Sequence, residues 1–213
     1  MTTWAIVVAA GRGERFGRPK QFERLAGRRV VDWALDDARD ACDGVVLVVP
    51  PGHDEPSGPR GWLGEVPVVV GGDSRSESVR RGLASVPEDA QVIVVHDAAR
   101  PAAGVELFRA VIDAVRAGAD GAVPGVAVVD TVKRVDGDVV VETLDRRTLV
   151  AVQTPQAFRA SALRSAHAAA AEATDDAALV ERAGGKVVVV PGHLANRKIT
   201  EPGDLDAIEQ ALG

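Results

Sequence analysis

The chain is 213 residues long, 46% of them hydrophobic, and it carries a formal net charge of −6 and one cysteine, Cys42. This length suits a single domain over residues 1–213, and no apolar run approaches the roughly 18 residues that a membrane-spanning helix needs, so we expect a cytoplasmic protein without membrane contact. The acidic balance argues against nucleic-acid binding, which needs a face of clustered lysine and arginine, and one cysteine permits neither an intrachain disulfide nor a multi-cysteine zinc site.

Short β-branched segments alternate with amphipathic segments of helical length, a pattern typical of βαβ units around a mainly parallel sheet with helices on both faces. The expected strands are Ala5–Ala9, Val45–Val49, Val66–Val70, Val92–Val95, Gly121–Val123, Ala127–Val129 and Lys186–Val190. The expected helices are Val31–Ala41, Ser74–Ser85, Val105–Ala117, Ser161–Ala173, Asp175–Ala183 and Pro202–Leu212. Ser74 and Glu77 have the spacing of a capping box, which favours a helix start at Ser74. The Pro- and Gly-rich segment Pro50–Gly64 is expected to be a surface loop.

One segment interrupts this alternation. From Thr131 to Thr143 the sequence reads TVKRVDGDVVVET, two β-prone runs about Asp136-Gly137, which predicts a β-hairpin. A hairpin inserted into a parallel α/β fold projects, here as an arm at about residues 131–150. Its two apolar faces need cover, and a second copy of the chain is the simplest source of that cover. We therefore expect a homodimer.

A glycine-rich turn, AAGRGERFGRPKQ, follows the first expected strand. Glycines here let the backbone approach a phosphate closely, and exposed N–H groups form an anion-binding site. Gly11, Gly13 and Gly17 do not have the spacing of a dinucleotide fingerprint, and the Gly-Lys-Ser/Thr of a Walker A loop is absent. A plain turn would explain the glycines alone, but the nearby Arg15 and Lys20 favour a phosphate site.

The segment VHDAARP follows the expected strand Val92–Val95. Ligands of open α/β sheets lie beyond the carboxyl ends of strands, so Asp97 is placed to hold a metal or a ligand hydroxyl; a turn or cap residue is the plain alternative. His96 is expected to be structural. The four histidines, at positions 53, 96, 167 and 193, lack metal-ligand spacing, so no zinc site is expected.

Seven sequence blocks, in order along nearly the whole chain, together resemble the 2-C-methyl-D-erythritol 4-phosphate cytidylyltransferase family of the non-mevalonate isoprenoid pathway. They are AAGRGERFGRPKQF, GGDSRSESV, VHDAARP, DTVKR, TLDR, QTPQAF and NRKIT. The first block is shared with sugar nucleotidyltransferases in general. VHDAARP together with DTVKR, TLDR and QTPQ is much more specific, although each short block by itself also fits a turn, a cap or a solvated face.

The resemblance implies a Rossmann-like nucleotidyltransferase fold and a homodimer with exchanged hairpin arms. It also implies transfer of CMP from CTP to 2-C-methyl-D-erythritol 4-phosphate, with Mg²⁺ as cofactor held by Asp97. The residues implied for the nucleotide are Ala10, Gly11, Arg12, Gly13, Gly72, Asp73 and Ser78. Those implied for the acceptor are Asp97, Arg100, Thr131, Thr154, Lys198 and, from the partner's arm, Arg146. Catalytic roles are implied for Arg15, Lys20, Arg146 and Lys198.

One position departs from the family pattern. Where the family often carries a second aspartate, directly before the segment Asn196–Thr200, this chain has Ala195. A single carboxylate is still reasonable, because Mg²⁺ keeps several waters and binds substrate phosphates. Two alternatives stay open: a ribitol-5-phosphate cytidylyltransferase, which shares the fold and most motifs, and a nucleotide-binding regulator without catalysis.

Overall fold

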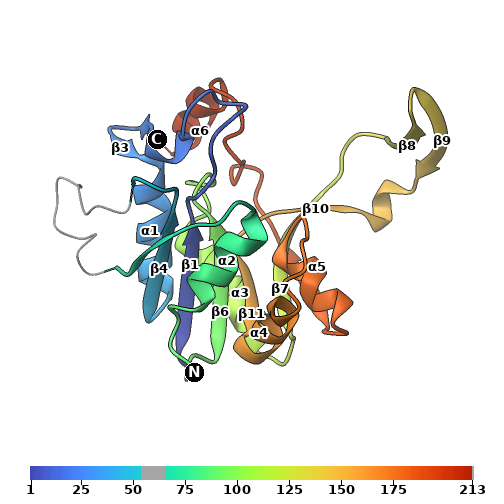
Figure 1. The fold of residues 1–213 in the computed structure, drawn as a ribbon. Helices are drawn as coiled ribbons and strands as arrows, with labels where there is room; N and C mark the ends of the chain where they lie inside the picture. Colours follow the sequence, from blue (N-terminus) through green and yellow to red (C-terminus); the bar gives the residue numbers. More distant parts are fainter. Residues whose placement is uncertain (54–65, 213) are drawn as a thin grey trace.

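A computed structural model describes residues 1–53 and 66–212, and an eight-stranded sheet forms its centre (Figure 1). The strands are β1 (Thr3–Val8), β4 (Gly44–Val49), β5 (Val68–Val70), β6 (Val92–Asp97), β7 (Gly121–Ala127), β10 (Val150–Val152), β11 (Gln156–Arg159) and β12 (Val187–Pro191). Their order is β10-β7-β11-β6-β1-β4-β5, with β12 also paired to β7. Strands β1, β4, β5 and β6 are mutually parallel, as are β7 and β12, while β10 and β11 run antiparallel to their neighbours. The predicted mainly parallel α/β fold is confirmed.

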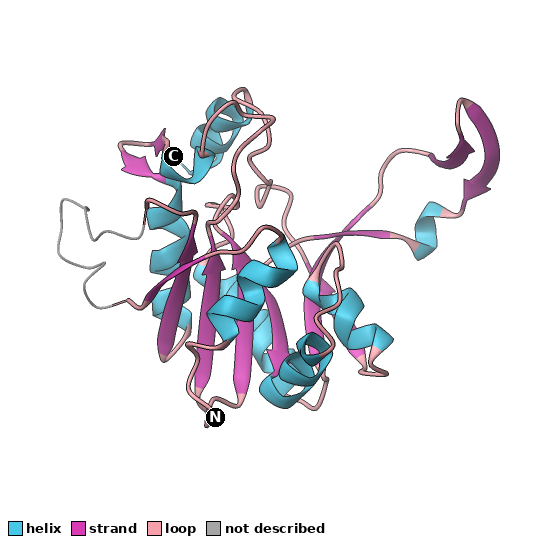
Figure 2. Cartoon of the chain, in the orientation of Figure 1, coloured by secondary structure: helices cyan, strands magenta, loops and turns pink. Residues whose placement is uncertain are grey.

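Helices cover both faces of the sheet, as Figure 2 shows. They are α1 (Val30–Ala41), α2 (Arg75–Leu83), α3 (Val105–Arg116), α4 (Ala160–Ala168), α5 (Asp176–Arg182) and α6 (Asp204–Leu212). Helices α1 and α3 pack on one face, and α2, α4 and α5 on the other. Successive strand residues point to opposite faces, so Val7 packs with the first helix layer and Ile6 with the second. The central strands therefore read as continuous apolar runs.

Several elements differ from the sequence predictions. The runs Gly121–Val123 and Ala127–Val129 were expected as separate strands, but β7 continues through Pro124, whose carbonyl accepts from the Gln153 N–H (2.8 Å). Helix α4 ends at Ala168, short of the predicted Ala173, because Ala170 adopts a left-handed conformation (φ 52°). Strands β10 and β11 were not anticipated.

A few short elements complete the carboxyl edge of the sheet. They are the 3₁₀ turn η1 (Lys20–Phe22) and the small hairpin of β2 (Arg24–Leu25) and β3 (Arg28–Arg29). A third apolar cluster, which includes Phe16, Ile199 and Ile208, packs α6 against this region. The predicted loop Pro50–Gly64 lies mostly outside the described residues. Within the described ranges, no helix has the length and apolarity to cross a membrane.

The predicted hairpin is confirmed and projects from the sheet as an arm (Figure 1). It comprises β8 (Val132–Asp136), β9 (Val139–Leu144) and the 3₁₀ turn η3 (Arg146–Thr148). Gly137 provides the positive φ (+56°) that the tight turn requires. Strands β8 and β9 form a two-stranded sheet of their own, separate from the central sheet.

Candidate active site

The glycine-rich turn begins at the carboxyl end of β1, level with the end of β6. The strand register pairs Val8 with Asp97, so the residues after both strands meet at one edge. Gly13 has φ +68°, and a Cβ there would collide with the Arg18 carbonyl, which explains why only glycine fits. The buried Gln21 amide donates to the carbonyls of Ala9 (2.6 Å) and Gly11 (3.0 Å). The path of the loop is thus fixed before any ligand binds.

A second loop, ahead of α2, faces this turn. The Gly72 N–H donates to Ser78 Oγ (3.1 Å), which fixes the loop to the helix. A side chain at Gly71 would collide with both Ala10 and Ser78, so glycine allows the two loops to approach. Their backbone groups form opposite walls of one cavity.

The start of α2 is capped much as the sequence predicted. Ser74 Oγ accepts from the Glu77 N–H (3.1 Å), the first half of the capping box. The Glu77 carboxylate, however, accepts from the Asp73 N–H (2.8 Å), one residue earlier than a capping box requires. Asp73 also pairs with Arg12 (3.1 Å) across the mouth of the cavity, where both side chains are largely exposed. Exposed pairs of this kind contribute little stability, so this one can open for a ligand.

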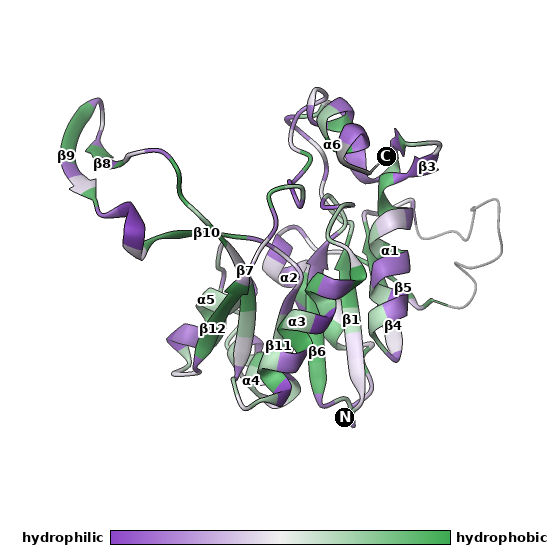
Figure 3. Cartoon of the chain, turned by 180° about the vertical axis from the view of Figure 1, so that it is seen from behind, coloured by the Kyte–Doolittle hydropathy of each residue, from purple (hydrophilic) through white to green (hydrophobic). Residues whose placement is uncertain are grey.

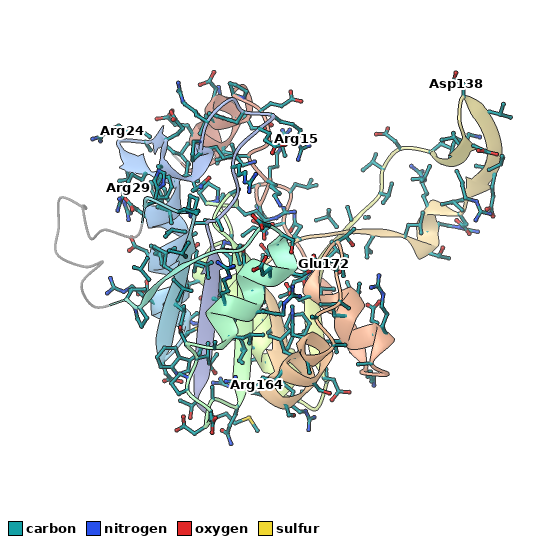
Figure 4. The ribbon with its side chains drawn as sticks, in the orientation of Figure 1. Arg15, Arg24, Arg29, Asp138, Arg164 and Glu172 are labelled. Atoms are coloured by element: carbon teal, nitrogen blue, oxygen red, sulfur yellow. The ribbon has the colours of Figure 1, made fainter. Side chains whose placement is uncertain are left out.

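The cavity between the loops has a volume of about 430 Å³. Predicted residues that line it are Ala10, Gly11, Arg12, Gly13, Arg15, Lys20, Gly72, Asp73, Ser78, Asp97 and Lys198. Figure 4 shows Arg15 at the end of the molecule where the glycine-rich turn lies. Burial, and then the charges of Lys198 and Arg15, lower the pKa of Lys20. Mutually repelling cations around an open cavity are suited to an anionic ligand.

Asp97 is the buried carboxylate of the site. Its Oδ2 lies 2.6 Å from Lys198 Nζ, and its Oδ1 lies 3.2 Å from Arg75 Nε. Burial alone would raise the pKa of Asp97, but Arg75 and Lys198 hold it well below its usual range. Asp97 is therefore ionised across the physiological pH range.

His96 lies beneath the site and is fully buried. His96 Nε2 donates to the Arg100 carbonyl (3.2 Å), because a carbonyl can only accept. In the neutral ring Nδ1 is then the acceptor, so it accepts from the Thr154 hydroxyl (3.1 Å), whose Oγ1 in turn accepts from the Asp97 N–H (3.0 Å). Burial lowers the pKa of His96 to about 4, so the ring is neutral. It orders Thr154 and Arg100, in line with the structural role expected from the sequence.

A smaller cavity of about 240 Å³ lies beside the first. The predicted acceptor residues Asp97, Arg100, Thr154 and Lys198 line it. Asp97, Lys198 and Arg75 line both cavities, so the two adjoin at these side chains.

Asn196 holds the segment that carries Lys198. The Asn196 side chain is buried and donates to the Thr154 carbonyl (2.9 Å), while the backbone carbonyl of Asn196 accepts from Arg100 (2.7 Å). Gln153 donates to the same carbonyl (3.1 Å). Together these bonds place Lys198 at the junction of the two cavities.

Two predicted residues stay outside both cavities. Thr131 precedes β8 and Arg146 begins η3, and neither residue lines either of these two cavities. Conversely, Gln21 and Arg75 belong to the site but were not among the residues predicted from the sequence. Arg75 could have been noticed as the first cation of the block GGDSRSESV, directly after a helix cap.

At the junction of the two cavities, the described residues offer Mg²⁺ one carboxylate, that of Asp97. Within residues 1–53 and 66–212, no group of three or more His, Cys, Asp and Glu side chains is arranged to hold a metal. Position 195, as the sequence shows, offers no carboxylate. Asp97 does present carboxylate oxygens where the cavities adjoin, and each oxygen keeps a lone pair beyond its one ion pair. Mg²⁺ prefers such oxygens and takes its other ligands from water and phosphates.

These features define a class of protein. A glycine-rich turn after the first strand, clustered cations, and a buried carboxylate at the adjoining cavity are those of a nucleotidyltransferase of Rossmann-like α/β fold.

Comparison with known proteins identifies the family. Residues 3–213 match the model of the 2-C-methyl-D-erythritol 4-phosphate cytidylyltransferase (IspD) family, and the chain belongs to that family. It is 42% identical to the 2-C-methyl-D-erythritol 4-phosphate cytidylyltransferase of Rubrobacter xylanophilus over 217 residues, 98% of this chain and 94% of the relative. The crystal structure of the Thermus thermophilus enzyme of that name superposes with a TM-score of 0.84 at 34% identity, covering 99% of this chain and 98% of the other.

Some relatives are longer than this chain. It is 41% identical to a bifunctional IspD/IspF enzyme of Solidesulfovibrio magneticus over 99% of its own residues, but it spans only 57% of that enzyme.

Proposed function

We propose that this chain transfers CMP from CTP to 2-C-methyl-D-erythritol 4-phosphate, giving 4-diphosphocytidyl-2-C-methyl-D-erythritol and pyrophosphate. The observation that carries the proposal is the pair of cavities that adjoin at Asp97 and Lys198. The larger one, with its backbone walls and cations, suits a nucleoside triphosphate. The smaller one suits a polyol phosphate, because Arg100 and Lys198 offer charge and Thr154 offers a hydroxyl.

The reaction is an in-line displacement at the α-phosphorus of CTP. An acceptor phosphate oxygen forms the new P–O bond, and the bond to the bridging oxygen breaks as pyrophosphate leaves. A phosphate monoester is largely ionised at pH 7, so no general base is required. Catalysis then consists mainly of alignment and charge neutralisation by Arg15 and Lys20.

The donor is held along the larger cavity. The turn Ala10–Gly13 receives the triphosphate, since its backbone approaches without side-chain hindrance. Gly72, Asp73 and Ser78 read the cytidine from the opposite wall. Preorganisation by Gln21 and Ser78 keeps both walls in place.

The acceptor site is completed by a second copy of the chain. In this proposal the arms are exchanged in a homodimer, and the partner subunit's arm brings Arg146 and Thr131 to the smaller cavity. Two observations support this. Thr131 and Arg146 line neither of the two cavities of their own chain, and β9 exposes consecutive valines.

Asp97 would hold Mg²⁺, which when bound neutralises charge on the phosphates. Asp97→Asn should then lose most turnover, whereas Ala195→Asp should stay active and require less Mg²⁺. Turnover at varied Mg²⁺ concentration measures both effects. An active Asp97→Asn enzyme with unchanged magnesium dependence would remove Asp97 from the metal site.

A matrix of substrates tests the proposed reaction. Pyrophosphate release is measured with each of the four common nucleoside triphosphates against methylerythritol phosphate and ribitol 5-phosphate. We expect CTP with methylerythritol phosphate to be fastest. Faster turnover with ribitol 5-phosphate, or with UTP or ATP, would contradict the proposed specificity, and CTP binding without pyrophosphate release would indicate a non-catalytic regulator.

A cytoplasmic location stays a prediction, which cell fractionation tests.

A further inference from the structure

A chain of buried polar contacts leads away from the junction of the two cavities. The guanidinium of Arg75, the first residue of α2, donates through Nε to Asp97 Oδ1 (3.2 Å) and through Nη1 to Asp176 Oδ2 (2.7 Å). On its other oxygen, Asp176 accepts from His167 Nε2 (2.9 Å). The side chain of Asp176 is fully buried, that of His167 is 3% exposed, and that of Arg75 is 22% exposed.

Arginine is suited to this position, because its rigid fork of donors can hold two carboxylates at once. Burial alone would lower the pKa of Arg75, but Asp97 and Asp176 raise it, so both contacts are charge-assisted. A lysine has a single charged nitrogen and cannot reproduce both contacts with the same geometry. Asp176 lines neither cavity, so its contact with the site runs through Arg75.

The second contact of Asp97 gives this arrangement its significance. Lys198 Nζ lies 2.6 Å from Asp97 Oδ2, and Lys198 also lines both cavities. If Asp97 had Lys198 as its sole cation, the lysine charge would be neutralised by a buried carboxylate. Because Arg75 shares that carboxylate, the lysine ammonium keeps charge and N–H donors for a ligand phosphate.

We propose that Arg75 is a positioning residue. Anchored by Asp176 and His167, it holds Asp97, and N–H donors of Lys198 therefore stay available to the acceptor phosphate. This inference rests on the proposed cytidylyl transfer, because that reaction defines the smaller cavity as the acceptor site. It assigns a role in substrate binding to Asp176, a residue that lines neither cavity.

Three variants test the proposal, R75K, D176N and their combination. The matched control is R80K, a second arginine of α2, which pairs with Glu172 and lines neither cavity. We expect R75K to raise KM for methylerythritol phosphate about tenfold, the factor typical of one charge-assisted hydrogen bond. D176N should raise the same constant while KM for CTP changes less than about twofold, because Asp176, unlike Arg75, lines neither cavity. R80K should change neither constant.

Additivity is the sharper measurement. If Asp176 acts through Arg75, the double variant should have the acceptor KM of R75K alone rather than the product of both effects. Independent, multiplying effects would overturn the proposal. Equal changes in the KM of D176N for CTP and for the acceptor would also overturn it, because they would indicate a general loosening of the site.

Calorimetric binding of methylerythritol phosphate, without CTP or metal, separates this inference from the proposed reaction. Wild-type protein that binds the acceptor but transfers no CMP would contradict the reaction alone. Unchanged acceptor binding by both R75K and D176N would overturn the role of Arg75 even in an active enzyme. Circular dichroism identifies a variant that fails to fold; if that is R75K, unchanged acceptor binding by D176N is then sufficient to overturn the proposal.

Discussion

Valine-rich strands occur both in the central sheet and in the arm, but their surroundings differ. Val46 and Val48 of β4 pack against the helix layer formed by α2, α4 and α5 and are fully buried. Val139 and Val140 of β9 are 66% and 54% exposed, and Figure 3 shows this apolar strand standing away from the rest of the chain. A local turn is enough to form the hairpin, but within one chain the valines of β9 stay exposed.

The predicted chemistry divides between the same two regions. The central sheet brings the nucleotide residues together with Asp97, Arg100, Thr154 and Lys198, while the arm carries Thr131 and Arg146. We therefore expect a substitution in the sheet region to abolish catalysis at the active site of the same chain. A substitution in the arm should instead impair the active site of the partner chain.

The largest effect is expected in the sheet region, at Lys20. Lys20→Ala removes one preorganised cation beside the triphosphate, which typically lowers kcat by about 10² to 10³, or about 2.7–4 kcal/mol. Arg15→Ala should behave alike. Steady-state kinetics measures kcat, and thermal unfolding measures Tm. Tm should not fall in Lys20→Ala, because the variant removes a charge that Lys198 and Arg15 repel. A near-normal kcat in either folded variant would contradict the assignment.

Complementation connects the two regions directly. Lys20→Ala and Arg146→Ala chains, refolded in equal amounts, give about half mixed dimers. With exchanged arms, one site of each mixed dimer has both defects and the other has neither. Activity should therefore recover to roughly a quarter of wild type, since half the dimers have one intact site of two.

If Arg146 served its own chain, every site in the mixture would keep one defect. Activity would then stay at the level of the single variants, with mixed dimers verified by mass spectrometry. That outcome would contradict arm exchange.

The smallest effect concerns the exposed valines. Val140→Asp places a charge on the arm, and we expect it to weaken the dimer about tenfold, by the cost of burying an unpaired polar group. Val189→Asp on β12 is the matched control, because Val189 is also 54% exposed on a strand. Light scattering across a dilution series measures both. An arm-mediated dimer would be contradicted if both variants dissociated to the same extent, or if neither dissociated.

The sequence predicted those parts of the fold that depend on local patterns. The first strand, the cap at Ser74 and the Asp136-Gly137 hairpin all follow from periodicity or turn chemistry within a few residues. Strand β11 was missed because its four residues form a strand only by pairing with β6 and β7, far away in the sequence.

The same distinction explains the site. The glycine turn and the segment around Asp97 are contiguous motifs that the sequence displays. The role of Arg75 depends on Asp176, 101 residues away, and no spacing in the sequence indicates that contact. Gln21 likewise appears in the sequence as an ordinary polar residue, and only the fold shows that it holds the glycine turn.

The bond between Lys198 and Asp97 also joins residues 101 positions apart, and this separation has a consequence for folding. During folding a loop of that length closes late, because the chain loses the loop's conformational entropy before the contacts at its ends stabilise it. Partly folded chains therefore lack the junction of the two cavities, and a ligand that needs it binds the native state alone. Such a ligand raises the free energy of unfolding, by about 2.7 kcal/mol at a hundred times its Kd. Substrate at such a concentration should thus slow the proteolysis that proceeds through global unfolding.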